Sequence, residues 1–117
     1  MSYKVMYTDA SVSDLALFNK PIQKVIRKAI DKVALNPLPK NEGGYGTPLG
    51  NRRGNNLTGL CRIKLLRFGI RVVYQLVRAD EVMKIIIIAA RADNEVYIQA
   101  AKRIDKTNNY RGHQTAN

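Results

Sequence analysis

The chain has 117 residues, of which 45% are hydrophobic and 25% charged. That is enough for one domain with its own core and too little for most multidomain enzymes. With 20 Lys and Arg against 9 Asp and Glu, the formal net charge is +11, which favours polyanionic partners such as nucleic acid. The longest fully apolar stretch, residues 85–90, is far shorter than the ~20 residues that span a bilayer. Residues 1–4 lack the apolar run of a signal peptide, so we expect a cytoplasmic protein without membrane contact.

The single cysteine and the single histidine exclude two kinds of site. Cys61 has no partner for an internal disulfide and cannot build a cysteine-rich zinc site. Its neighbours are apolar, so we expect it to be a small hydrophobic residue of the core. His113 lies in a polar tail, residues 106–117, which we expect to be disordered. The sequence therefore does not favour a histidine-based active site or a metal site.

The first third of the chain predicts one strand and two helices. Residues 3–7 alternate and are rich in β-forming side chains, which indicates a short strand. Thr8 and Asp9 are good N-cap residues for a helix from residue 10 to about residue 18. Pro21 suits the first turn of a second helix, which ends at residues 36–37 and whose apolar residues form one stripe.

The remainder predicts a loop, three strands and a helix. Residues 37–56 are rich in proline and glycine, so we expect a loop there. Two strands, 61–66 and 70–77, flank a hairpin turn at residues 67–69, and the apolar segment 82–90 indicates a central strand. Residues 95–104 can form a last helix. The order β-α-α-β-β-β-α predicts a single α+β domain over residues 1–105, with helices packed on a mostly antiparallel, four-stranded sheet.

The positive charge is concentrated in one part of the chain. Residues 43–79 contain no Asp or Glu, and their cations are Arg52, Arg53, Arg62, Lys64, Arg67, Arg71 and Arg78. A solvated surface usually mixes both signs, so this zone is a better candidate for binding a polyanion than the second helix. The lysines of that helix, including Lys24 and Lys28, are typical of the solvent side of an amphipathic helix.

Arg62 and Lys64 are two residues apart on a predicted strand, so both point from the same face of the sheet. Burying two cations in the core is too costly, so that face must meet solvent or a ligand. A two-residue turn at Phe68-Gly69 would place Arg71 on the same face, whereas a three-residue turn with a bulge at Gly69 would place it on the other. The sequence leaves this register open.

Arg91 closes the central strand, and Tyr97 follows in the first turn of the last helix. Three or four cations on one sheet face, with a phenol nearby, resemble a phosphodiester site, because arginine binds phosphate oxygens through paired hydrogen bonds.

Several short segments together carry a family resemblance. In chain order they are Pro48-Leu49, Gly59-Leu60-Cys61-Arg62-Ile63-Lys64, Gly69-Ile70-Arg71-Val72-Val73-Tyr74, Arg91 and Glu95-Val96-Tyr97. This series resembles the RelE/ParE toxin superfamily, specifically the RelE branch of ribosome-dependent mRNA interferases, from about residue 3 to residue 104. The resemblance implies the toxin of a type II toxin–antitoxin system, which cuts mRNA in the ribosomal A site by attack of the ribose 2′-OH on the adjacent phosphate. It implies no metal and no cofactor.

Carried over by position, the resemblance implies that the catalytic residues are Arg62, Lys64, Arg71, Arg91 and Tyr97. We assign Lys64 as the base, because neighbouring cations oppose its protonation, and Arg62 and Arg71 as the groups that hold the phosphate. Arg91 would stabilise or protonate the leaving oxygen, and Tyr97 would orient a base or stack on it. Asp93 stands where some relatives carry another basic residue.

The resemblance also implies partners: a cognate antitoxin, the ribosome with its mRNA, and operator DNA only through the antitoxin. We expect ribosomal RNA to be contacted by Arg52, Arg53, Arg67, Lys24 and Lys28. Two alternatives stay open. One is a ParE-type inhibitor of DNA gyrase on the same fold, and the other is a non-catalytic nucleic-acid-binding module.

Overall fold

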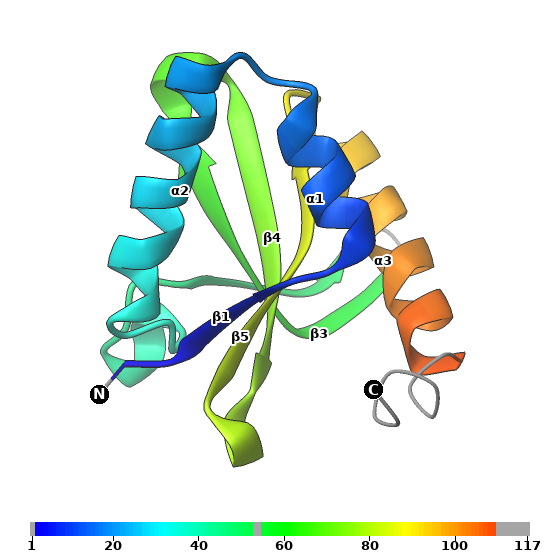
Figure 1. Ribbon diagram of the computed structural model, residues 1–117. Helices are drawn as coiled ribbons and strands as arrows, with labels where there is room; N and C mark the ends of the chain where they lie inside the picture. The colour runs from blue at the N-terminus through cyan, green and yellow to red at the C-terminus, as the bar shows by residue number, and fades with distance from the viewer. Residues whose placement is uncertain (1, 53–54, 110–117) are drawn as a thin grey trace.

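The sheet at the centre of the molecule has more strands than the sequence indicated (Figure 1). The computed structural model describes the backbone of residues 2–52 and 55–109 and the side chains of residues 2–50 and 56–104. Within these residues the strands are β1 (Lys4–Tyr7), β2 (Thr47–Arg52), β3 (Asn55–Leu65), β4 (Ile70–Val77) and β5 (Val82–Ala89). Their order is β1-β5-β4-β3-β2, and each pairing is antiparallel except that of β1 with β5. The α+β class and the mostly antiparallel sheet are confirmed.

Helices cover both faces of the sheet. The side chains of α1 (Asp9–Ala16) and α2 (Lys20–Ala34) pack against one face, and those of α3 (Asp93–Asn109) pack against the other. The helix starts follow the capping chemistry of the sequence. The side chain of Thr8 accepts a hydrogen bond from the Ser11 amide at 3.2 Å, and that of Asn19 accepts one from the Ile22 amide at 3.0 Å. Within the described part of the chain, no helix is long and apolar enough to cross a membrane.

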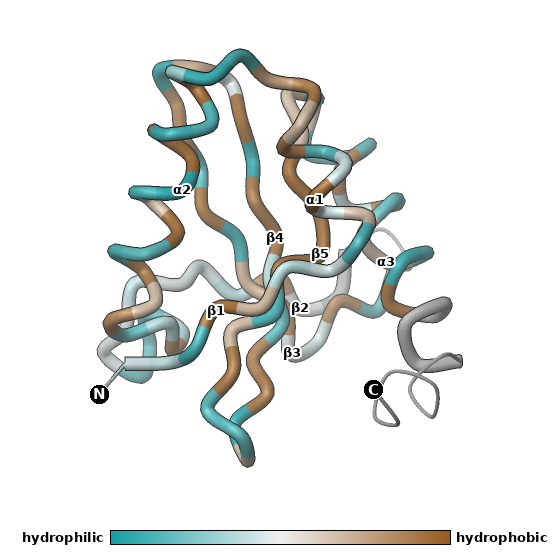
Figure 2. Tube along the Cα trace, in the orientation of Figure 1, coloured by the Kyte–Doolittle hydropathy of each residue, from teal (hydrophilic) through white to brown (hydrophobic). Residues whose placement is uncertain are grey.

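The two faces hold separate hydrophobic cores. Along α2, apolar and polar residues alternate with the helical repeat (Figure 2), and Ile26 and Ile30 are fully buried against the sheet. Each such side chain contributes about 1.5–3 kcal/mol when removed from water. Cys61 belongs to this first core and is 2% exposed, which confirms its prediction as a buried hydrophobic residue. The second core joins the sheet to α3 through Val96, Tyr97 and Ala100.

The prediction of four strands is wrong, because the sheet has a fifth strand, β2, in the segment predicted to be a loop. Thr47 pairs with Arg62, Gly50 pairs with Leu57, and a bulge separates Pro48 from Gly50. Proline and glycine argue against a central strand, but β2 is an edge strand, where a missing amide and a bulge are tolerated. Gly50 has φ +62°, which an L side chain rarely adopts.

The last helix also exceeds its predicted bounds. It begins at Asp93 and continues to Asn109, so residues 106–109, expected to belong to a disordered tail, are helical. The rest of that tail, including His113, lies outside the described residues.

A hydrogen bond connects the loop before β2 to the first core. The hydroxyl of Tyr74, which is fully buried on β4, donates a hydrogen bond to the Pro37 carbonyl at 2.7 Å. Burial raises the pKa of this hydroxyl well above its usual value, so it is a permanent donor. Gly46 lies directly against it: a Cβ there would be 2.2 Å from the Tyr74 hydroxyl oxygen.

β1 pairs with the first half of β5, and a residue of helix α1 binds the backbone of the second half. The two strands pair over residues 4–7 and 82–85, so β1 reaches only half of β5. Beyond that point the Asp14 carboxylate accepts a hydrogen bond from the Ile88 amide at 3.0 Å. Arg103 of α3 donates to both oxygens of Asp14, at 2.6 and 3.0 Å, and to the Ile86 carbonyl at 2.9 Å. This edge pair, Asp14–Arg103, connects the helices on opposite faces of the sheet.

Candidate functional site

The hairpin between β3 and β4 decides where the predicted cations point. Four residues separate the strands: a 3₁₀ turn, Leu66–Phe68, followed by Gly69 in the left-handed conformation with φ +65°. Lys64 consequently pairs with Arg71, and Arg62 pairs with Val73. This register matches neither turn considered from the sequence. It is shifted by two residues from the two-residue turn, and because side chains alternate with a period of two, Arg71 still shares the face of Arg62 and Lys64.

The three cations converge on one carboxylate. Asp93, the first residue of α3, lies with its Oδ2 3.1 Å from Lys64 Nζ and 3.6 Å from Arg62 Nη1. Its Oδ1 accepts a hydrogen bond from Arg71 Nε. The three cationic side chains are 19–29% exposed, so this cation cluster, Arg62, Lys64 and Arg71, is half-buried and not a freely solvated surface. Burial opposes ionisation of Asp93, but the hydrogen bonds from Arg71 and Lys64 outweigh it and lower the pKa of the carboxyl.

Tyr97 of α3 lies beside the cluster, between the helix and the sheet. Its hydroxyl accepts a hydrogen bond from Arg62 Nη1, so the same guanidinium nitrogen faces both Tyr97 and Asp93. The Tyr97 side chain belongs to the second core and is only 4% exposed. A ring this deeply buried has no face available to a nucleotide base in this arrangement, which argues against the predicted stacking role. The group that the Tyr97 hydroxyl holds here is the Arg62 guanidinium, and the predicted orientation of a nucleotide base by Tyr97 stays a prediction.

Arg91 approaches the cluster through its backbone. Arg71 Nη1 donates hydrogen bonds to the Arg91 carbonyl at 2.6 Å and to the Gly69 carbonyl at 3.1 Å. These bonds fix the Arg71 guanidinium between the hairpin turn and the segment that follows β5. Arg91 itself is exposed and lines a cavity of about 410 Å³ between α1 and α3. The cluster and the Arg91 backbone are therefore neighbours, although the side chain of Arg91 makes no ion pair with the described residues.

The residues predicted to contact ribosomal RNA are spread over the molecule. Arg67 is exposed on the hairpin turn, next to the cation cluster. Lys24 and Lys28 are exposed on α2, which packs on the opposite face of the sheet. Of Arg52 only the backbone is described, at the end of β2, and Arg53 lies outside the described residues. The structure thus brings Arg67 close to the cluster and places the two lysines far from it.

Solved structures resemble this arrangement of sheet and helices. No protein-family model matches the chain, and no curated protein matches it in sequence. A mutant of the toxin RelE from E. coli in the free state superposes with a TM-score of 0.68 at 23% identity, over 89% of this chain and 99% of that one. The chain has the RelE toxin fold.

Toxin–antitoxin complexes give the same match. A RelBE complex from Mycobacterium tuberculosis has a TM-score of 0.62 at 22% identity, over 80% of this chain and 95% of that one. The archaeal RelE–RelB complex from Pyrococcus horikoshii has a TM-score of 0.56 at 22% identity, over 80% and 99%. The predicted RelE resemblance is confirmed at the level of the fold.

Sequence reasoning missed the central residue of this candidate site. Asp93 was noted as a departure from the pattern of relatives, with no contact assigned to it. The available signal was its place at the start of the last helix, directly after the central strand, in a chain with few acidic residues. Its three partners depend on the β3–β4 register and on the docking of α3, which the sequence did not fix.

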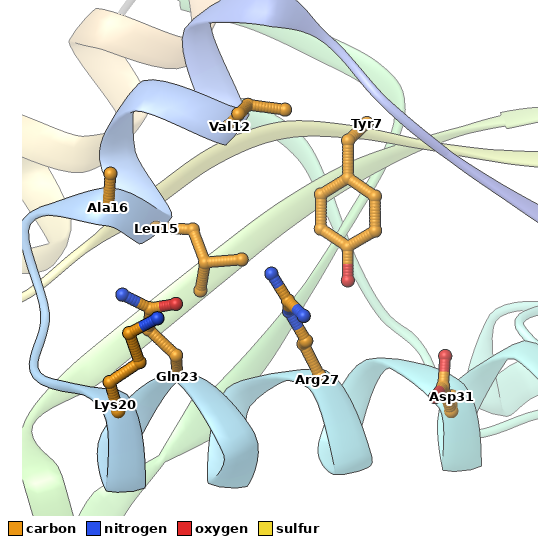
Figure 3. A pocket seen from close by; sticks show the side chains of 8 residues that line it. All are labelled: Tyr7, Val12, Leu15, Ala16, Lys20, Gln23, Arg27 and Asp31. Carbon is orange, nitrogen blue, oxygen red and sulfur yellow. The ribbon is translucent and has the colours of Figure 1, made fainter.

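A second concave surface of this RelE-like domain lies between α1 and α2, on the face opposite the cation cluster. It is a groove of about 670 Å³ with apolar side chains on the α1 side and polar ones on the α2 side (Figure 3), lined by Tyr7, Val12, Leu15, Ala16, Lys20, Gln23, Arg27 and Asp31. Burial raises the pKa of the Tyr7 hydroxyl, Asp31 adds to this, and Arg27 opposes it. Because the α2 side of the groove carries both positive and negative charges, the groove is less suited to a polyanion than the cation cluster.

Proposed function

We propose that this RelE-like domain is the toxin of a type II toxin–antitoxin system and cleaves mRNA on the ribosome. One observation carries the proposal: on a RelE fold, Arg62, Lys64 and Arg71 converge on a single oxyanion, the Asp93 carboxylate. Three half-buried cations around one point are suited to the charge that gathers on a phosphoryl group during cleavage. That action would take place in the cytoplasm.

The proposed reaction is attack of a ribose 2′-OH on the adjacent phosphate. Lys64 accepts the hydroxyl proton, Arg62 and Arg71 bind the phosphoryl oxygens, and the 5′-oxygen leaves with a proton that Arg91 helps to deliver. The products are a 2′,3′-cyclic phosphate and a 5′-hydroxyl. Tyr97 and the Arg91 carbonyl position the two guanidinium groups, because each accepts a hydrogen bond from one of them.

The partners follow from the same proposal. The solved RelE relatives include complexes with an antitoxin, and we propose that a cognate antitoxin binds this chain and carries any contact with operator DNA. Ribosomal RNA is the proposed target of Arg67, Lys24, Lys28, Arg52 and Arg53. Binding through such contacts releases counterions, so the affinity for ribosomes should fall steeply with salt.

The decisive experiment is primer extension on a translated mRNA, with and without ribosomes. Lys64→Met removes the proposed base without adding a charge and should lower cleavage by about 10²–10⁴-fold while ribosome binding persists. Lys32→Met is the matched control, because Lys32 is exposed on α2, which packs on the face of the sheet opposite the cluster, and this variant should cleave like wild type. Normal cleavage by Lys64→Met would refute the base assignment. Intact mRNA together with defects in DNA supercoiling would favour gyrase as the target.

A further inference from the structure

The position of Asp93 has a consequence for substrate binding. We propose that the Asp93 carboxylate is a tethered competitor of the substrate: it occupies the place between Arg62, Lys64 and Arg71 that an RNA phosphate takes, and it must leave before RNA can bind there. This inference rests on the proposed function for the class of ligand, a phosphodiester, and adds a residue that controls access to the site.

The geometry supports competition over simultaneous binding. Oδ1 of Asp93 accepts from Arg71 Nε, and Oδ2 lies 3.1 Å from Lys64 Nζ and 3.6 Å from Arg62 Nη1, so its two oxygens contact all three cations. A phosphate presents its oxygens to the same donors. Holding it there beside an ionised carboxylate would place like charges within a few ångströms in a half-buried site, which is strongly unfavourable.

Both arginines make further hydrogen bonds besides their contacts with Asp93. Arg62 Nη1 also donates to Tyr97, and Arg71 Nη1 also donates to the carbonyls of Arg91 and Gly69. These contacts hold the guanidinium groups in place whether or not Asp93 is present. The site is therefore pre-organised for an oxyanion, and Asp93 is the group within it that can be exchanged.

Asp93 has a route out of the cluster. Its side chain is 38% exposed, so rotation about its own side-chain bonds moves the carboxylate into water without disturbing the core. It is also the first residue of α3, where unpaired backbone amides and the helix dipole stabilise a nearby negative charge. Displacement consequently needs no movement of the helix.

Displacement by RNA also bears on the proposed base. While Asp93 accepts a hydrogen from Lys64 Nζ, the amine is held as a donor and cannot take a proton from a 2′-OH. Protonation of Asp93 cannot release it near neutral pH, because hydrogen bonds from Arg71 and Lys64 keep its pKa low despite burial. A competing phosphate is then the group that removes the Asp93 carboxylate from Lys64.

Binding of an uncleavable RNA tests the competition. The probe is a short single-stranded RNA with 2′-O-methyl groups at every position, followed by fluorescence anisotropy at fixed salt. Asp93→Asn should bind it about tenfold more tightly than wild type, as expected for removing one charge from a partly screened cluster. Asp80→Asn is the control, since it makes the same change of net charge on an exposed residue at the far end of β4. Equal shifts for both variants would overturn the proposal.

A measurement on the wild-type chain covers the case that Asp93→Asn does not fold. The carboxyl ¹³C resonance of Asp93 should titrate at a higher pKa when the 2′-O-methyl RNA is bound, because the carboxylate has lost its cations. An unchanged pKa would refute displacement. The proposed function fails separately: Lys64→Met could still cleave mRNA while Asp93→Asn binds RNA more tightly, or cleavage could depend on Lys64 while Asp93 has no effect on binding.

Discussion

Replacing Asp14 by alanine should destabilise the fold more than replacing its partner Arg103 by methionine. Asp14 serves two groups, since it binds the Arg103 guanidinium through both oxygens and accepts the Ile88 amide of β5. Asp14→Ala leaves the Arg103 guanidinium without its carboxylate, with the Ile86 carbonyl still accepting from it, and leaves the Ile88 amide without its acceptor. Arg103→Met leaves a carboxylate that keeps the Ile88 amide, and the methionine still covers part of the apolar surface under the arginine stem.

The magnitude follows from the burial of the pair. Breaking a fully buried, hydrogen-bonded ion pair costs about 3–5 kcal/mol, and an orphaned buried amide costs about 1–3 kcal/mol. The Asp14 and Arg103 side chains are 14% and 20% exposed. Water can therefore reach the charge that is left unpaired, which lowers the cost of breaking the ion pair. We expect a loss of about 3–4 kcal/mol for Asp14→Ala and about 2 kcal/mol for Arg103→Met. The double variant should lose less than the sum, because neither charge is then left unpaired.

Urea denaturation of the wild type, both single variants and the double variant closes this thermodynamic cycle. The free energies of unfolding give a coupling energy, expected to be about 1–2 kcal/mol in favour of the pair. Additive losses below ~1 kcal/mol for each single variant would show that the pair behaves as a surface salt bridge and would refute the reasoning.

Three further predictions concern packing, a thiol and pH. Gly46→Ala should cost more stability in urea than Gly50→Ala, because its Cβ would meet the rigid Tyr74 hydroxyl, whereas at Gly50 there is only the penalty of a positive φ, about 1–2 kcal/mol. Burial raises the pKa of the Cys61 thiol, so this thiol should react with a thiol reagent only at the rate of unfolding. Fast labelling of the native protein would contradict its burial. The folded-state pKa of Asp93 lies below its usual 3.8, so its ion pairs stabilise the fold above that pH and this contribution disappears as the pH falls through the lowered pKa. Wild type should exceed Asp93→Asn in stability by about 1 kcal/mol at pH 7 and lose that advantage near pH 2, and a constant difference would contradict this.

The shared face of Arg62 and Lys64 was predictable because the strand repeat alone determines it. The face of Arg71 was not, since it depends on a four-residue turn whose conformation is set by a 3₁₀ turn and a left-handed Gly69. The two-residue turn correctly placed Arg71 on the face of Arg62 and Lys64, although its register is wrong. The observed register differs from it by two residues, and a shift of two residues leaves each side chain on the same face of the sheet.

The missed features depend on tertiary context. Pro48 and Gly50 of β2 are typical of a loop, and the strand tolerates them because it lies at the edge of the sheet. Tyr97 at a helix start could equally have been exposed, and its burial follows from how α3 docks on the sheet. The convergence of three cations on Asp93 requires both the hairpin register and this docking.

The edge pair on β5 also bears on aggregation. The segment Ile85 to Ile88 combines four β-branched residues without a charge, a composition typical of segments that assemble into intermolecular sheets. Such assembly needs free amides and carbonyls along a strand edge, and β1 leaves that edge open beyond residue 85. Asp14 binds the Ile88 amide and Arg103 binds the Ile86 carbonyl, so two polar side chains take the positions that a foreign strand would need. The ion pair that joins the two helices thereby also opposes self-association through β5.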